Sequence, residues 1–266
     1  MKRLLLASSV ALAISGSAFA ADMSPPPPAL KAPPPPPPTW TGCYIDGGVG
    51  YGMWNVDHTT TDFTGLTTVK TTDGGRGWLG RVGAGCDYQV APKWVIGVLG
   101  DYDFMDLTGS NSPSLIDPVS GSPLTANMKE QGAWYAGARI GYLIAPSILS
   151  YIDGGYTETR FTQGNEFLTA TGTPFGFQFQ NFTSQGWFLG GGVETALSDW
   201  WSGLPAGLYV RTEYRFSSYD HRNINEFAVA TGVPDGNVER MTPYVQTVTT
   251  SLVWKWNWAA PGTVHW

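Results

Sequence analysis

Residues 208–216 read Leu-Tyr-Val-Arg-Thr-Glu-Tyr-Arg-Phe, and this stretch decides how the chain folds. Side chains alternate between the two faces of a β-strand. One face would therefore carry Leu208, Val210, Thr212, Tyr214 and Phe216, and the other Tyr209, Arg211, Glu213 and Arg215. A soluble sheet turns such an apolar face inward. Whether this strand does the same is decided by the other stretches of the chain.

The first 20 residues have the pattern of a secretory signal peptide. Lys2 and Arg3 precede an apolar run over residues 4–14, and Ala18-Phe19-Ala20 has the small-x-small pattern of a cleavage site. The apolar run is shorter than the roughly 20 residues that a membrane-spanning helix needs. The sequence thus predicts export, with cleavage after Ala20.

The mature chain is acidic and rich in glycine and aromatic residues. Without the signal, 13 Lys and Arg stand against 21 Asp and Glu, which gives a formal charge of −8. This balance does not favour nucleic acid as a partner. The full sequence has 34 glycines and 36 aromatic residues, which favour a β protein, and no stretch after the signal has the length and apolarity of a transmembrane helix. A membrane form of this chain would have to be a closed barrel.

Residues 21–39 are dominated by proline, which cannot donate the hydrogen bonds of a sheet and prefers the extended polyproline II form. We interpret them as a periplasmic linker. Eight stretches with a period of two follow, at residues 40–55, 77–89, 94–107, 129–142, 148–161, 185–197, 208–216 and 243–258.

The connections between these stretches alternate in length. Four are long and polar, at residues 57–72, 108–128, 162–184 and 219–242, and the other three are short. This alternation is typical of outer-membrane barrels, which have short periplasmic turns and long external loops. We therefore predict an all-β, eight-stranded antiparallel up-and-down transmembrane β-barrel over residues 40–258, followed by a tail at 259–266. The alternative is a soluble lipocalin-like barrel with its apolar face inside.

In a membrane barrel the charged face lines the lumen. That face would carry seven acids and four arginines: Asp46, Arg81, Asp87, Asp101, Asp103, Arg139, Asp153, Glu194, Arg211, Glu213 and Arg215. Gln131 and Tyr135 are expected beside them. An eight-stranded barrel is just wide enough for side chains to fill, and an unpaired buried charge is costly. We expect these groups to pair into a plug. The acidic excess leaves a narrow cation-preferring pore as the alternative.

Aromatic residues on the apolar face gather near the strand ends. Trp78 and Tyr88 are ten residues apart on one face, which corresponds to about 25 Å along the membrane normal for a tilted strand. This equals the expected apolar band. The outer girdle would consist of Trp78, Trp134 and Trp187, and the periplasmic girdle of Tyr88, Trp94, Tyr142 and Trp256.

The two cysteines fall on the same face of neighbouring predicted strands, near the same end. Directly opposed Cβ atoms on antiparallel strands lie about 4.5–5.5 Å apart, close to bonding range, and an exported protein meets an oxidising compartment. The sequence predicts a disulfide between Cys43 and Cys86. The alternative is a pair of unlinked apolar thiols.

Several short motifs together carry a family resemblance: Trp40-Thr-Gly-Cys-Tyr-Ile, Gly85-Cys-Asp-Tyr-Gln, Val95-Ile-Gly-Val, Arg139-Ile-Gly-Tyr, Gly190-Gly-Gly-Val-Glu and Arg211-Thr-Glu-Tyr. The chain resembles the small outer-membrane β-barrel proteins of alphaproteobacteria, which are related to the OmpA transmembrane domain. The resemblance covers residues 40–258. One departure concerns the terminal aromatic residue that the insertion machinery reads, because eight residues follow Trp258 and the chain ends at Trp266.

The resemblance implies a bacterial outer-membrane protein without enzymatic activity or cofactor, which contributes to envelope integrity and displays surface loops. The implied partners are outer-membrane lipids and lipopolysaccharide, the barrel-insertion machinery, and host, phage or cell-surface molecules that contact the loops.

Enzymatic motifs are weak. Residues 75–80 match G-x-G-x-x-G but begin a strand instead of joining a strand to a helix, so no phosphate-binding turn is implied. The histidines, His58, His221 and His265, are expected in loops or the tail, without metal-ligand spacing.

Two sets of acid-bearing residues are candidate sites. A lipid-modifying hydrolase built on Ser218, His221 and Glu226 is the least favoured alternative. A calcium site at Asp101, Asp103 and Asp106 is not favoured, because Asp106 falls on the opposite face from the other two.

Overall fold

The computed structural model describes residues 40–113, 115–116, 121–201, 203–205 and 207–256. The predicted signal peptide at 1–20, the linker at 21–39, Trp258, the tail at 259–266 and His265 lie outside the described residues.

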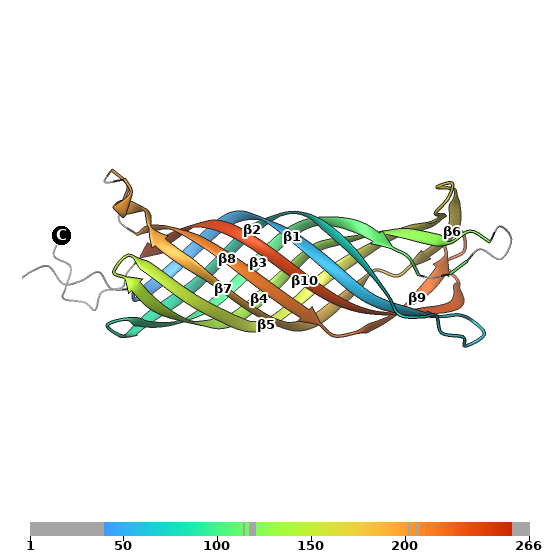
Figure 1. The fold of residues 1–266 in the computed structure, drawn as a ribbon, viewed down its shortest axis with the longest axis horizontal. Coiled ribbons are helices and arrows are strands. Elements are labelled where there is room, and N and C mark those ends of the chain that lie inside the picture. Colours follow the sequence, from blue (N-terminus) through green and yellow to red (C-terminus); the bar gives the residue numbers. More distant parts are fainter. Residues whose placement is uncertain (1–39, 114, 117–120, 202, 206, 257–266) are drawn as a thin grey trace, which may run out of the picture. The chain divides into compact units, whose positions relative to one another are not determined.

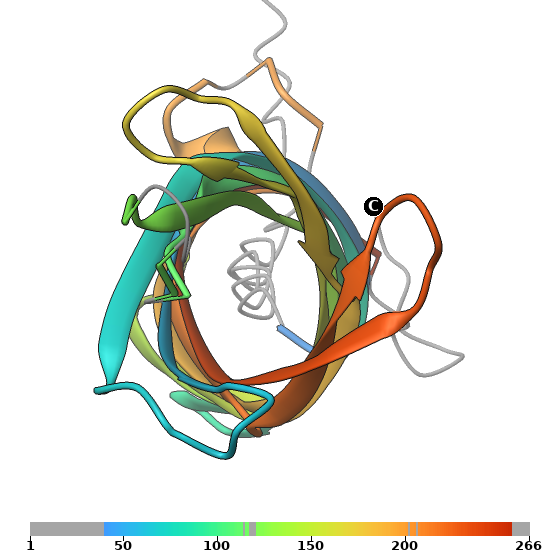
Figure 2. The same ribbon diagram turned by 90° about the vertical axis from the view of Figure 1, so that its right-hand side faces the viewer.

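Eight long strands pair with their neighbours and close into a ring (Figures 1 and 2). They are β1 (Gly42–Thr61), β2 (Thr71–Ala91), β3 (Trp94–Asn111), β4 (Leu124–Ala145), β5 (Ile148–Leu168), β7 (Phe182–Ala196), β8 (Leu208–Tyr219) and β10 (Pro234–Trp256). Every pairing is antiparallel, and β1 closes the ring against β10 over most of its length. The predicted all-β barrel is confirmed.

Two short strands were not predicted. The strands β6 (Pro174–Phe179) and β9 (Arg222–Ala228) lie in segments that were expected to be loops. The strand β6 pairs with β5 and β9, and β9 also pairs with β10. The long strands also extend further than expected, because backbone pairing continues beyond the level where apolar residues alternate with polar ones.

The connections define the two ends of the barrel. At the turn end, residues 92–93 join β2 to β3 and residues 146–147 join β4 to β5. There the short 3-10 helix η1 (Leu197–Asp199) lies between β7 and β8. At the loop end lie the long connections together with β6 and β9, on the right of Figure 1 and facing the viewer in Figure 2. No helix within the described ranges has the length and apolarity to cross a bilayer.

The two faces of the wall have opposite chemistry. The outward Trp78 is 69% exposed, whereas the inward Arg81, three residues further along the same strand, is 4% exposed. Valine, isoleucine and leucine side chains, such as Val82 and Ile140, are exposed on the outside of the barrel. This inversion contradicts the lipocalin-like alternative, in which the apolar face would be buried, and it agrees with an apolar solvent around the barrel.

One predicted orientation was wrong. Gln131 was expected in the lumen but is exposed, and the neighbouring Glu130 is buried instead. The pairing of β4 with β5 shifts register between Glu130 and Gly132. Such a bulge places one extra residue on one strand and exchanges the faces beyond it.

The structure joins Cys43 to Cys86 in a disulfide, at directly paired positions of β1 and β2 near the turn end. A cross-link that closes a loop of this length restricts the unfolded chain and stabilises the barrel by up to about 4 kcal/mol.

We predict that the protein, unfolded in denaturant without a reducing agent, exposes no reactive thiol. The same sample after reduction should titrate two thiols, because the described residues contain no free cysteine. Two reactive thiols before reduction would contradict the disulfide.

Replacing Val82 by arginine tests whether the outer face of the barrel contacts lipid. Val82 lies between the levels of Trp78 and Tyr88, and an arginine near the bilayer midplane costs about 2–4 kcal/mol. We expect Val82→Arg to lower the free energy of unfolding by this amount in denaturant titrations of vesicle-embedded protein. The control is Val69→Arg, at a position that is 77% exposed between β1 and β2 and should tolerate the change. Equal stability of the two variants would contradict a lipid-facing wall.

Candidate functional site

The lumen holds two clusters of paired charges. The turn-side cluster consists of Asp46, Asp87, Arg139, Glu194, Arg211 and Lys255. The loop-side cluster consists of Arg81, Asp101, Asp103, Asp153, Glu213 and Arg215. Each of these side chains is at most 8% exposed. The structure thus brings together all eleven charged residues that the sequence places in the lumen.

The turn-side cluster is centred on two acids. Glu194 pairs with three cations: its Oε2 accepts from Nη1 of Arg139 at 3.3 Å and Nε of Arg211 at 3.0 Å, and its Oε1 lies 2.7 Å from Nζ of Lys255. Asp87 accepts from Nε of Arg139 at 2.8 Å and from Nζ of Lys255 at 2.9 Å. Three acids and three cations therefore balance in this cluster.

The loop-side cluster contains two arginines and four acids. Arg81 donates two parallel hydrogen bonds to Asp103, at 2.6 and 2.8 Å, and a third to Glu213 at 2.6 Å. Arg215 donates to Asp101 at 2.7 Å and to Asp153 at 3.2 Å. Such two-pronged arginine–carboxylate pairs combine strength with a fixed geometry.

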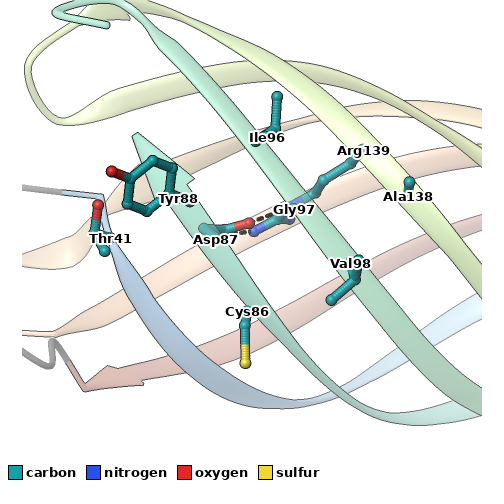
Figure 3. A pocket seen from close by; sticks show the side chains of 9 residues that line it. All are labelled: Thr41, Cys86, Asp87, Tyr88, Ile96, Gly97, Val98, Ala138 and Arg139. Carbon is teal, nitrogen blue, oxygen red and sulfur yellow. Dashed lines mark hydrogen bonds and ion pairs between the residues drawn. The ribbon is translucent and has the colours of Figure 1, made fainter. Parts of the chain in front are cut away.

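Inward glycines make room for these pairs. Gly97 of β3 lies beside the Asp87–Arg139 pair, as Figure 3 shows. A Cβ atom at this position would overlap the carboxylate of Asp87. The ring of Trp54 similarly fills the space that Gly75 leaves, since a Cβ there would overlap the indole. The small residues of the wall are therefore matched to large side chains in the lumen.

Apolar layers close the lumen on both sides of the charged clusters. Toward the loop end, buried side chains including Trp54, Leu107, Phe161 and Met241 pack into one cluster. Nε1 of Trp54 donates to the carbonyl of Leu107 at 3.0 Å, which satisfies its polar atom. Toward the turn end a second cluster contains Trp40, Val95, Leu143 and Leu149. The charges therefore lie between two apolar layers.

Lys255 belongs to the turn-side cluster but is not among the eleven predicted lumenal charges. The sequence does indicate its lumenal position, because Lys255 alternates with Trp254 and Trp256 on β10. Both tryptophans are exposed on the outer face. Nζ of Lys255 also lies 4.3 Å from the centre of the Trp40 ring.

His58 was expected in a loop, and this was wrong. It lies on β1 and is buried at the loop end. Its Nδ1 is 2.8 Å from Oε1 of Glu239, and its Nε2 is 3.1 Å from Oδ2 of Asp73. Nδ2 of Asn111 donates to the other oxygen of Glu239 at 2.8 Å. Burial opposes protonation of His58, but the hydrogen bonds to Asp73 and Glu239 outweigh it and raise its pKa to about 9.

The girdle residues all lie exposed on the outer face of the barrel. Toward the loop end are Trp78, Trp134 and Trp187, and toward the turn end are Tyr88, Trp94, Tyr142 and Trp256. The rings of Trp94 and Tyr142 contact each other edge to face, with centres 5.1 Å apart. Their role as anchors at the two membrane surfaces stays a prediction.

The hydrolase residues are not assembled. Ser218 faces outward on β8, in the same alternation as Tyr214 and Phe216, whereas Glu226 is buried and bound to Asn237. Among the residues that the structure describes, no hydrogen bond or ion pair joins Ser218, His221 and Glu226. The G-x-G-x-x-G match lies within β2.

Comparison with known proteins agrees with this architecture. The 31 kDa outer-membrane immunogenic protein of Brucella melitensis biotype 1 is 28% identical over 233 residues, which cover 84% of this chain and 90% of that protein. The 25 kDa outer-membrane immunogenic protein of Brucella canis is 26% identical over 225 residues, which cover 84% and 87%.

Among solved structures, the outer membrane protein OprG from Pseudomonas aeruginosa aligns with a TM-score of 0.50 and 14% identity, over 80% of this chain and 96% of that one. This likeness concerns the fold alone. Residues 10–255 match the family described as outer membrane protein beta-barrel domain. The protein therefore belongs to this family of outer-membrane β-barrels and lies in the bacterial outer membrane, as the resemblance of its sequence motifs implied.

Proposed function

We propose that the protein is a non-enzymatic, non-conducting barrel that contributes to the integrity of the outer membrane and presents its loop end to the outside of the cell. The observation that carries this proposal is the lumen, which is filled by two charge clusters between two apolar layers.

The pairing of the lumenal charges supports a plug over a pore. Seven acids stand against five cations once Lys255 is included, so the acidic excess is smaller than the sequence suggested. A permeating ion would have to displace fixed, nearly dry ion pairs and then pass the layer around Trp54, which is fully buried. The barrel would therefore act as a rigid structural element of the membrane without an open channel.

The loop end supplies the surface that would meet other molecules. Four long connections and the extra strands β6 and β9 lie there, and both curated relatives described above are named immunogenic outer-membrane proteins. Loops on a rigid scaffold commonly carry recognition. We propose that this end contacts lipopolysaccharide, host or phage molecules, and that the turn end faces the periplasm.

Planar-bilayer recordings test whether the lumen is closed to ions. We expect no stable conductance steps from the wild-type protein, because under this proposal the charged clusters and apolar layers close the lumen to ions. Steps of constant size that changed in Arg81 or Arg211 variants would contradict the proposal and favour a narrow pore.

Removing one partner of the lumenal network should destabilise the barrel. Arg81→Ala removes the cation that Asp103 hydrogen-bonds and leaves Glu213 with Arg215 as its remaining arginine. Breaking a buried pair in this way costs about 3–5 kcal/mol. The loss should appear in urea unfolding of vesicle-embedded protein. The control is Arg160→Ala, because Arg160 is exposed on β5. Equal stability of the two variants would show that the network is dispensable.

The His58 cluster predicts a pH dependence at the loop end. Because the pKa of His58 rises from 6.5 to about 9, its stabilisation is complete below pH 6.5 and is lost as the pH rises through 9. We expect the fall in unfolding free energy between pH 6.5 and 10 to be smaller in His58→Gln than in wild type. His221→Gln, at an exposed position, should keep the wild-type slope. A wild-type slope in His58→Gln would contradict the assignment.

A further inference from the structure

The loop end contains a sequence repeat. Residues 165–176 read Asn-Glu-Phe-Leu-Thr-Ala-Thr-Gly-Thr-Pro-Phe-Gly, and residues 225–236 read Asn-Glu-Phe-Ala-Val-Ala-Thr-Gly-Val-Pro-Asp-Gly. Eight of the twelve positions are identical, at a spacing of 60 residues. The first copy joins β5 to β6 and the second joins β9 to β10.

The two copies fold alike. Gly172 and Gly232 have φ of +70° and +66°, and each donates its N–H at 2.8 Å to the carbonyl at the start of its turn, on Leu168 or Ala228. Gly176 also has a positive φ, like its equivalent in the second copy. Because positive φ strongly favours glycine, the shared glycines explain why both copies form the same turn.

The repeat delivers equivalent glutamates to one place. The strand β6 pairs with β9, and the carboxyl of Glu166 from the first copy faces that of Glu226 from the second. The two side chains are 0% and 1% exposed. Apart from the carboxyl of Glu226, no group among the described residues hydrogen-bonds either oxygen of Glu166, and no cation there pairs with either carboxyl.

Two facing buried carboxylates need a positive charge between them or a shared proton. Burial raises the pKa of Glu166 to about 7 and that of Glu226 to about 9. The charged groups around the pair are acidic as well: Asp235 and Glu239 on β10, and Asp62 in the connection between β1 and β2. Of these, Glu239 is already neutralised by its pairing with His58.

A cavity of about 410 Å³ opens beside Glu226, within the size range of small-molecule sites. Its two walls come from equivalent positions of the repeat. The first copy and its continuation contribute the rings of Phe175 and Phe177, and the second copy and its continuation contribute Asp235 and Asn237. The cavity therefore has an aromatic wall and an acidic wall, and further apolar lining comes from Phe63, Leu115, Ile116 and Leu124.

Asn237 holds the acidic wall in place. Its Nδ2 donates to Glu226 at 2.6 Å and to Asp235 at 2.7 Å, and its Oδ1 accepts from the backbone N–H of Phe63 at 3.2 Å. One amide thus ties β9, β10 and the connection after β1 together around the cavity.

We propose that this cavity is a binding site for an organic cation, a protonated amine that carries an aromatic or other apolar group. The ammonium would lie at the Glu226 side, close to Glu166 and Asp235, and the apolar group would pack on Phe175 and Phe177. The bound charge would replace the proton that the two glutamates otherwise share. This site is independent of whether the lumen conducts ions.

Calorimetric titration of the refolded full-length chain in detergent micelles tests the proposal, with micelles alone as the blank. We expect phenethylammonium to bind at pH 7.5 and to release protons, so that the heat depends on the ionisation enthalpy of the buffer. Neutral 2-phenylethanol and anionic 3-phenylpropionate should bind at least about tenfold more weakly, because they cannot form the charge-assisted hydrogen bond.

Matched variants separate the two walls. Glu226→Gln should weaken phenethylammonium binding at least about tenfold, whereas Asp220→Asn, the same carboxyl-to-amide change at an exposed position outside the cavity, should not. Phe175→Ala should weaken phenethylammonium binding but leave methylammonium binding unchanged. Heat-dependent mobility in SDS gels checks that each variant folds, and Asp235→Asn replaces Glu226→Gln if the latter does not.

Three results would overturn the proposal. Equal binding of the amine and the alcohol would make the cavity merely apolar. Undiminished amine binding by both Glu226→Gln and Asp235→Asn would show that the acidic wall is not used. Binding of calcium chloride instead of the amine, lost in the same variants, would identify an inorganic cation as the occupant.

Discussion

Closure of the backbone hydrogen-bond ladder between β1 and β10 is the constraint on which the rest of the structure depends. In hydrocarbon an unpaired N–H or C=O has no water to bond, so a sheet can remain there only as a ring without edges. Nineteen residue pairs join these two strands, from Cys43 with Trp256 to Thr61 with Val238. Once the ring is closed, each strand must present one face to lipid and the other to a narrow interior.

The narrow interior in turn dictates the charge pairing. Side chains from opposite walls of an eight-stranded ring reach one another, as when Arg81 of β2 bonds Glu213 of β8. The ion pairs therefore connect strands that are far apart in the sequence, and glycines such as Gly97 provide the space that they occupy. At the loop end the same interior holds Glu166 and Glu226, for which the described part of the chain supplies no cation, and the proposed ligand would contribute the missing charge there.

The wall could be predicted from the sequence because lipid imposes a strict alternation on it. That rule correctly oriented residues 208–216 and placed the eleven lumenal charges and both cysteines. The alternation rule failed for the parts of the strands outside the bilayer, because lipid does not contact them. Beyond the Trp78 level the strands continue without apolar alternation, so His58 was assigned to a loop, and a bulge reversed the orientation of Gln131. The glutamate pair depends on a sequence repeat and on the pairing of β6 with β9, which a search for alternation does not detect.

The inward glycines also have a consequence for how such a chain can change over time. A substitution at Gly75 or Gly97 has to find room among buried rings and ion pairs, so it would need a simultaneous change on another strand. At Val82 or Ile140 the new side chain needs only to be apolar, because fluid hydrocarbon adapts to its shape. We therefore expect the sequences of related barrels to differ mainly at lipid-facing positions and in the loops. The side chains of the interior should change together or stay the same.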